Sequence, residues 1–412
     1  MRILRVLRAN RRNRTLLALG TVILIYTFAT SVMQYNLALF SNGLSPNYTV
    51  FGAVMGLPWL FSLLTDMPAG ALAERIGKKR MIVIGLGGLA ASGAFFYFVS
   101  GIVELFWVLV FFGTFEGFLT VAGMSSVIAV SPHGSEHRFV GGYTSASALG
   151  YAFGPLFGGL VVAWFGSRLP FLVFGAICLV AMFIAAMIIP DPRHEHDPIA
   201  PALRKVFVHD RIYLAGLREF FSGGRISWLV GIAVLLSGMW SEFIWAMEPV
   251  FVAGLGLSPL LGGLVLTAFV VPFTALDYPI GIWIDRTQKR FVSIVIGLIL
   301  GGVSMILFGV ASSPLLLIGL AALVSTAYAF FYVAVNGIFD SLSDRHRRGH
   351  MTGVWQAAED IGYVLGPIAG GVLADAFHLS GAFVAFGLLF LLASFGIGWM
   401  RKDIHRYESH AA

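Results

Sequence analysis

The sequence predicts an all-α membrane protein with twelve transmembrane helices in two pseudo-symmetric six-helix bundles. Three observations predict this fold: an apolar composition, a series of apolar runs of membrane-spanning length, and motifs that occur once in each half of the chain. Of the 412 residues, 58% are hydrophobic and 12% are charged, and the mean hydropathy is +0.85. Soluble domains carry about 25% charged residues, so the composition indicates a membrane protein.

The apolar runs are expected to be helices. A helix needs about 20 apolar residues to cross the hydrocarbon core, and in lipid its backbone groups must be hydrogen-bonded within the segment. In the first half the expected spans are 15–39, 49–73, 81–100, 104–130, 138–165 and 169–190. In the second half they are 226–252, 258–284, 291–310, 314–340, 352–376 and 380–400. We therefore expect bundles at 1–190 and 226–412, joined by a cytoplasmic linker at 191–225.

The cations predict the orientation of these spans. On the predicted topology, 26 of the 27 Lys and Arg residues fall on one side of the membrane, and only Arg168 falls on the other. The positive-inside rule makes the cation-rich side cytoplasmic. Both termini are then cytoplasmic, and the short loops favour a bacterial inner membrane. The basic charge thus reflects topology, and we expect no nucleic-acid partner.

Two motifs repeat at a distance of about half the chain. The loop after the second span contains Asp66, Pro68, Gly70, Glu74, Arg75, Lys78 and Lys79. The loop after the eighth span repeats this pattern 211 residues later, with Asp277, Pro279, Gly281, Asp285, Arg286, Lys289 and Arg290. Span five carries Gly150, Gly154 and Pro155, and span eleven carries Gly362, Gly366 and Pro367, 212 residues later. The sequence therefore contains a six-helix unit twice.

These motifs resemble those of the major facilitator superfamily, and the resemblance covers essentially the whole chain. Residues 70–80 read Gly-Ala-Leu-Ala-Glu-Arg-Ile-Gly-Lys-Lys-Arg, similar to the family pattern Gly-x-Leu-Ala-Asp-Arg-x-Gly-Arg-Lys-Arg. Glu74 replaces the family Asp, and the second copy has Gln288 where the first has Gly77. The Gly-Pro pattern of span five is similar to that of the drug/proton antiporters. The resemblance implies a transporter that works by alternating access, with substrate bound at the midplane between the bundles.

The repeated loops are interpreted as a cytoplasmic gate. Gly70 and Gly281 lack side chains, so we expect neighbouring helices to approach closely there. The acid–arginine pairs of the two loops are expected to pair between bundles in one state and to separate in the other. Asp66 and Asp277 are assigned to the same gate. The alternative is that the cations only enforce topology.

The glycine motifs of spans five and eleven are interpreted as a helix-packing surface. Gly150, Gly154, Gly362 and Gly366 are expected to allow close approach, and Pro155 and Pro367 to bend or soften their helices. The alternative is an inert packed interface.

Ionisable residues at membrane depth are costly and are functional candidates. All those in the predicted spans are acidic, so an anionic substrate is disfavoured. The family resemblance places Glu116 and Glu242 on cavity-lining spans, and an apolar environment would favour reversible protonation of such a carboxyl. A structural hydrogen bond remains the alternative for Glu116, and the arginine that the antiporters carry upstream in span four is absent here. Further candidates for proton or substrate binding are Gln34, Tyr35, Trp245, Tyr332, Asn336 and Asp360.

The preferred functional prediction is proton-coupled efflux of lipophilic neutral or cationic small molecules. Aromatic faces next to carboxylates suit lipophilic cations. The alternatives are uptake of a neutral solute such as a sugar or peptide-like metabolite, lipid export, or a sensor or assembly partner that does not transport. No nucleophile–base pair or metal-ligand set is visible, so we expect no enzyme activity, no cofactor and no metal. We expect the protein to be a monomer in the lipid bilayer. Its expected partners are a small-molecule substrate and protons, which serve as the coupling ion.

Overall fold

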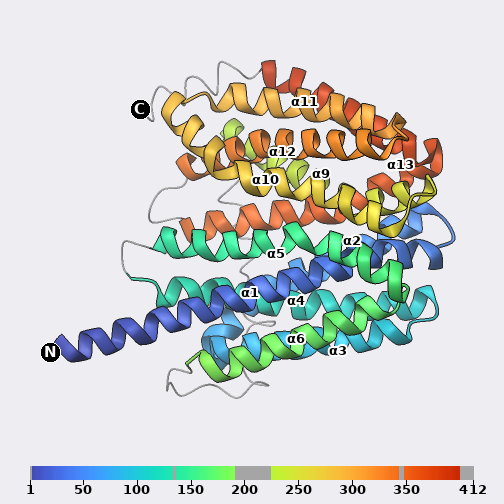
Figure 1. The fold of residues 1–412 in the computed structure, drawn as a ribbon. Helices are drawn as coiled ribbons and strands as arrows, with labels where there is room; N and C mark the ends of the chain where they lie inside the picture. Colours follow the sequence, from blue (N-terminus) through green and yellow to red (C-terminus); the bar gives the residue numbers. More distant parts are fainter. Residues whose placement is uncertain (1, 133–135, 191–223, 343–347, 400–412) are drawn as a thin grey trace. The chain divides into compact units, whose positions relative to one another are not determined.

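The computed structural model describes residues 2–132, 136–190, 224–342 and 348–399, and its regular secondary structure there is entirely helical (Figure 1). The first six helices are α1 (Arg2–Leu44), α2 (Tyr48–Ile76), α3 (Lys78–Phe98), α4 (Ile102–Val130), α5 (Glu136–Phe165) and α6 (Leu169–Ile188). The others are α9 (Gly224–Gly254), α10 (Pro259–Thr287), α11 (Arg290–Val310), α12 (Pro314–Leu342) and α13 (Arg348–Trp399). Most of the expected linker, 191–223, lies outside the described residues.

Helix α13 contains the last two membrane crossings. Its 52 residues are interrupted at His378, whose φ of 60° and ψ of 171° are not helical. The break falls between the expected spans 352–376 and 380–400. In the described part of the chain, eleven helices are long and apolar enough to span a membrane, and the last of these spans covers 43 residues, Trp355–Ile397. Divided at His378, it gives the twelve transmembrane helices of the predicted fold.

The two copies of the repeated loop turn at the same point. Gly77, directly after α2, has φ of 98°, and Gln288, directly after α10, has φ of 52°. Left-handed backbone costs a residue with a side chain roughly 1 kcal/mol, and glycine adopts it readily. Both residues have positive φ, but ψ is 132° at Gly77 and 29° at Gln288, so only Gln288 lies in the left-handed helical region. The positive φ explains the glycine of the first copy, whereas Gln288 adopts a positive φ without that freedom.

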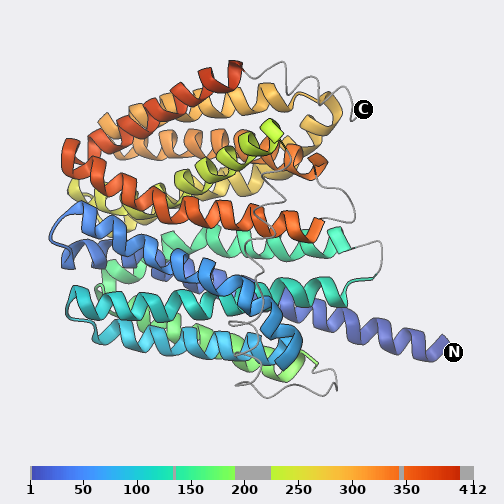
Figure 2. The ribbon, with the colours of Figure 1, turned by 180° about the vertical axis from the view of Figure 1, so that it is seen from behind.

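The chain divides into two compact units, which are described separately. The first comprises Met1–Asn36 and Leu57–Arg211, and the second Leu37–Gly56 and Ile212–Ala412. In the first unit α3 lies beside α4 and α6, as both ribbon views show (Figures 1 and 2). In the second, α13 packs against α9 and α11, and α12 packs against α10 and α11.

The start of α2 packs within the second unit. The Asp375 carboxylate on α13 accepts hydrogen bonds from the Tyr48 N–H at 2.9 Å and from the Thr49 N–H at 2.8 Å. It also accepts one from the Thr49 hydroxyl at 2.6 Å. Side-chain oxygens commonly satisfy the first N–H groups of a helix from the preceding residue, but here the acceptor comes from a distant helix.

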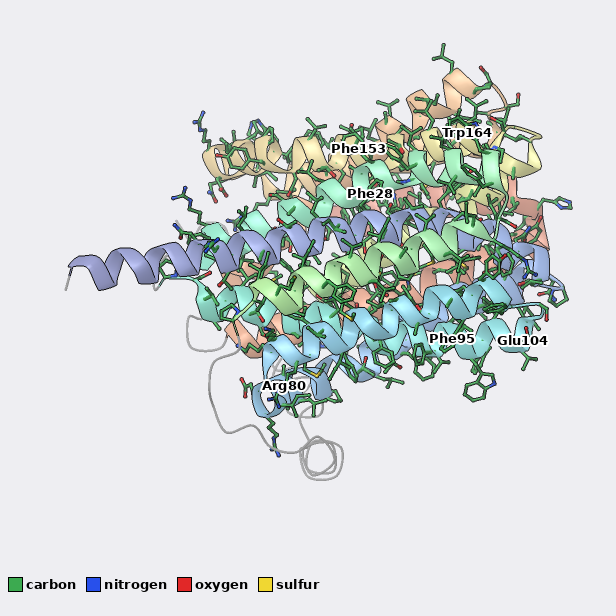
Figure 3. The ribbon with its side chains drawn as sticks, turned by 60° about the horizontal axis from the view of Figure 1, so that its bottom comes forward. Phe28, Arg80, Phe95, Glu104, Phe153 and Trp164 are labelled. Carbon is green, nitrogen blue, oxygen red and sulfur yellow. The ribbon has the colours of Figure 1, made fainter. Side chains whose placement is uncertain are left out.

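The two ends of the first unit differ in the residues that they carry. Figure 3 shows Arg80 at one end of these helices, and Glu104 and Trp164 at the other. Apolar side chains between the ends stay exposed, among them Phe95 and Phe153. A lipid-facing surface requires such side chains, because the bilayer core solvates apolar groups and not charged ones.

Candidate functional site

Glu116 is a buried carboxylate inside the first unit. It lies in the middle of α4, with 2% of its surface exposed. Its Oε1 accepts a hydrogen bond of 2.9 Å from the Tyr26 hydroxyl on α1. Its Oε2 has no hydrogen-bond partner among the described residues. A buried charge without full compensation is costly, so this position favours a carboxyl that exchanges a proton over a permanently ionised one.

A second carboxylate, Asp66 of α2, interacts electrostatically with Glu116. The two helices approach closely at Gly117, where a methyl group would lie 2.6 Å from Oδ1 of Asp66. Ser62 donates a 3.2 Å hydrogen bond to the same oxygen. Neighbouring carboxylates disfavour simultaneous ionisation, so two charges at Asp66 and Glu116 would be unfavourable together.

The second unit contains a different carboxylate centre at Glu359 of α13. Glu359 is 5% exposed and forms hydrogen bonds with the side chains of Tyr332, Trp355 and Tyr363. Trp355 and Tyr363 lie one turn before and one turn after Glu359 on α13, and Tyr332 comes from α12. Three side chains with a donor group therefore surround one carboxylate.

Aromatic rings surround this centre. Tyr328 and Tyr332 stack with ring centroids 5.4 Å apart, and Trp355 meets Tyr332 edge-on at 6.3 Å. Glu242 of α9, which is 6% exposed, interacts electrostatically with Tyr328 and Tyr363. Carboxylates and aromatic rings that lie close together attract cations and disfavour anions.

The other candidates for proton or substrate binding differ in how deeply they are buried and in what they contact. Tyr35 is fully buried, and its ring packs against Gly158 of α5, so it lies in a helix–helix interface. Gln34 is buried, and Asp360 accepts a 3.0 Å hydrogen bond from Gln356. Trp245 and Asn336 are half-buried, as is Tyr332. Of this set, the structure brings Tyr332 and Glu242 together near Glu359.

The gate candidates lie at the ends of α2 and α10. Glu74, Asp277, Asp285 and Arg286 are exposed, and Asp66 and Arg75 are half-buried. Lys78 donates a hydrogen bond of 3.0 Å to the backbone oxygen of Ser125 on α4, which ties the first loop to its own unit.

The expectation of close approach at Gly70 and Gly281 needs correction. A methyl group at Gly70 would lie 3.6 Å from Val121, and one at Gly281 would lie 3.8 Å from Val333. These are ordinary van der Waals distances to side chains. Neither glycine is therefore required by helix packing in this structure.

The glycine motifs of α5 and α13 do lie at close contacts. A methyl group at Gly150 would lie 2.7 Å from the Leu24 backbone oxygen on α1, and one at Gly154 would meet Ser31. On α13, methyl groups at Gly362 and Gly366 would meet the backbone of α9 around Met239, at 2.9 Å and 2.5 Å. The adjoining prolines, Pro155 and Pro367, lie inside their helices. Each motif thus lets α5 or α13 approach a neighbour almost backbone to backbone.

Sequence reasoning missed several members of these centres. The spacing of Trp355, Glu359 and Tyr363 is a visible signal, because residues four apart share a helix face. No local signal links Tyr26 to Glu116, which is 90 residues away. Among the described residues, no group of three His, Cys, Asp or Glu side chains is placed to hold a metal.

The comparison with protein families decides the identity of the fold. The Major Facilitator Superfamily model matches residues 17–247 and 230–411. The chain belongs to this superfamily. It is a membrane transporter with many spans, and not an enzyme.

Relatives of this superfamily member align along most of their length. An uncharacterised transporter of Methanocaldococcus jannaschii is 22% identical over 93% of this chain and 97% of its own. The multidrug efflux pump LfrA of Mycolicibacterium smegmatis is also 22% identical, over 90% of this chain and 83% of its own.

Solved structures show the same fold. A bacterial homologue of the human lysosomal transporter Spinster, solved inward-facing and unoccupied, matches with a TM-score of 0.73 and 17% identity, over 97% of both chains. A peptide transporter in complex with alafosfalin matches with a TM-score of 0.76 and 14% identity, over 95% of both chains.

Proposed function

We propose that the chain exports lipophilic neutral or cationic small molecules in exchange for protons, by alternating access. The observation that carries this proposal is Glu116, a buried carboxylate with one hydrogen bond and a second carboxylate beside it. In an apolar interior the ionised form of such a carboxyl is costly, so the group is suited to binding a proton and releasing it during transport. The similarity to a multidrug efflux pump supports the direction and the substrate class.

The remaining parts of the proposal follow from the sequence. The bundles are 1–190 and 226–412 with a linker at 191–225, the termini are cytoplasmic, and the protein works as a monomer in a bacterial inner membrane. The positive-inside rule supports this orientation. We assign the gate to Asp66, Gly70, Glu74, Arg75, Asp277, Gly281, Asp285 and Arg286.

The test is transport by purified protein in vesicles with an imposed proton gradient. Wild type is expected to move tetraphenylphosphonium against its gradient, driven by protons moving the other way. Glu116→Gln is expected to lose the drive from the proton gradient, because its amide cannot exchange a proton in this cycle, while exchange of the cation across the membrane continues. Glu104→Gln is the matched control on the same helix, because Glu104 is exposed and only caps the start of α4.

Two outcomes would overturn the proposal. One is a wild-type transport rate that does not depend on the proton gradient at any pH. The other is a Glu116→Gln variant that responds to the gradient as fully as wild type and Glu104→Gln do. A panel of neutral lipophilic compounds, run in the same vesicles, separates neutral from cationic export.

A further inference from the structure

The proposed function makes no use of Glu248, a buried carboxyl in the second unit. Glu248 lies on α9 with 0% of its surface exposed, and neither of its carboxyl oxygens has a hydrogen-bond partner among the described residues. Glu116 differs, because the Tyr26 hydroxyl donates to one of its oxygens. An ionised carboxylate that is buried without partners is strongly disfavoured. The packing around Glu248 therefore favours its neutral, protonated form.

The part of α9 that carries Glu248 is buried on every side. Residues 246–252, about two turns of helix, are all buried. Phe251 comes three residues after Glu248 and so shares its helix face. Its ring packs against Phe308 of α11 and Phe383 of α13, with centroids 5.5 Å and 5.1 Å away. Water reaches the carboxyl only if this packing opens, so the exchange of its proton depends on that opening.

No charged neighbour in the described part of the chain compensates the carboxyl. Burial is the one influence that acts on Glu248. The titratable and charged side chains of the helices around it are therefore not coupled to it. They are Glu242 on α9, Asp277 on α10, Arg290 on α11, Tyr328 and Tyr332 on α12, and Glu359, Asp360, Tyr363, Asp375 and His378 on α13.

The opening that would expose Glu248 is a local one. The buried run ends at Val252, and Ala253 and Gly254 are exposed. Ala253 is five residues beyond Glu248, which is about 8 Å along the helix axis. Pro249 lies inside the helix directly after Glu248, and a proline has no N–H to bond the preceding turn. The end of α9 can therefore loosen while the rest of the unit stays folded.

We propose that Glu248 is a proton-controlled switch, whose protonated form keeps residues 246–252 packed and whose ionised form releases them to water. Each opening then releases one proton, because a glutamate in water is ionised above a pKa of about 4.3. The packing is most stable in acid and loosens as the pH rises, and its opening constant should increase about tenfold for each pH unit. The switch goes beyond the proposed function, since it involves neither the cargo nor Glu116.

The test is hydrogen exchange of the full-length protein in detergent, followed by mass spectrometry on peptides that cover 246–254. Exchange is expressed as protection factors, which remove the intrinsic pH dependence of amide exchange. Between about pH 6 and pH 8 the wild-type protection factor should fall about tenfold per pH unit. Peptides from α3, in the first unit, should show no such fall. A wild-type protection factor at 246–254 that does not change with pH would overturn the proposal.

Variants at Glu248 test whether this carboxyl causes the pH dependence. Glu248→Gln keeps the size of the protonated acid and cannot ionise, so its protection factor should stay constant with pH. Glu248→Asp still titrates and should keep the fall. The same fall in Glu248→Gln as in wild type would overturn the proposal. If thermal melting shows that Glu248→Gln does not fold, Glu248→Leu takes its place, because an apolar side chain suits this packing and also cannot ionise.

Glu116→Gln distinguishes failure of this inference from failure of the proposed function. It should keep the pH-dependent opening at 246–254 and lose only the response of transport to the proton gradient. A pH dependence that disappears in Glu116→Gln and persists in Glu248→Gln would overturn the inference and leave proton exchange at Glu116 intact. Opening that depends on Glu248, in a protein whose transport does not depend on the proton gradient, would overturn the proposed coupling and support the inference.

Discussion

At the scale of single residues, one hydrogen bond fixes Glu116. The Tyr26 hydroxyl donates to Oε1, and its removal leaves a buried carboxyl without that partner. We expect Tyr26→Phe to lower the free energy of unfolding by about 1–3 kcal/mol. In combination with Glu116→Gln, a double-mutant cycle should give a coupling energy of about 1 kcal/mol, measured by thermal or denaturant unfolding in detergent. Additive effects of the two substitutions would show that the bond contributes nothing to stability.

The same scale shows where sequence reasoning reaches its limit. Glu359 was visible in the sequence with Trp355 and Tyr363 at helical spacing, so two of its partners could have been anticipated. The sequence also makes Tyr332 a binding candidate, but its proximity to Glu359 depends on where α12 lies relative to α13. Such a contact depends on how the helices pack, and no pattern in the neighbouring sequence predicts it.

At the scale of helices, close contacts distinguish one glycine from another. A methyl group at Gly150 would meet the backbone of α1, 2.7 Å from the Phe28 nitrogen, whereas one at Gly141 on the same helix has nothing within 4 Å. We expect Gly150→Ala to destabilise the protein by about 1–3 kcal/mol through overpacking. Gly141→Ala should be neutral or stabilising by up to about 1 kcal/mol, because alanine favours helix. Thermal melting of both variants checks the difference in sign, and equal shifts would contradict the packing argument.

Helix boundaries followed from the sequence more closely than helix contacts did. The apolar runs and their flanking loops predicted twelve spans, including the division of α13 near His378. Repetition predicts that the two loops are equivalent, and in both a residue with positive φ follows the helix, Gly77 after α2 and Gln288 after α10. The close approach expected at Gly70 and Gly281 is absent, because a glycine in a motif does not reveal whether a helix or open space lies opposite it.

At the scale of the whole molecule, hydrogen bonds join residues that are far apart in the chain. The start of α2, at Tyr48, groups with the second unit, whereas the rest of the helix from Leu57 groups with the first. Asp375 accepts the backbone bonds from Tyr48 and Thr49, which lie 327 and 326 residues away. The apolar pattern of α2 predicted one continuous span and gave no sign that its two ends pack in different units.

We therefore expect Asp375 to stabilise the start of α2 from a distance. Asp375→Ala should lower the free energy of unfolding by about 1 kcal/mol, because the first N–H groups of α2 lose their acceptor and the site is exposed to water. Hydrogen exchange at Tyr48 and Thr49 should become faster, as measured by mass spectrometry on peptides from α2. Glu104→Ala is the control, because Glu104 accepts the Ser100 N–H within its own segment, and its loss should affect only the start of α4. If both variants accelerate exchange at Tyr48 equally, the effect is general loosening, and the bond to Asp375 is not what holds this end of the helix.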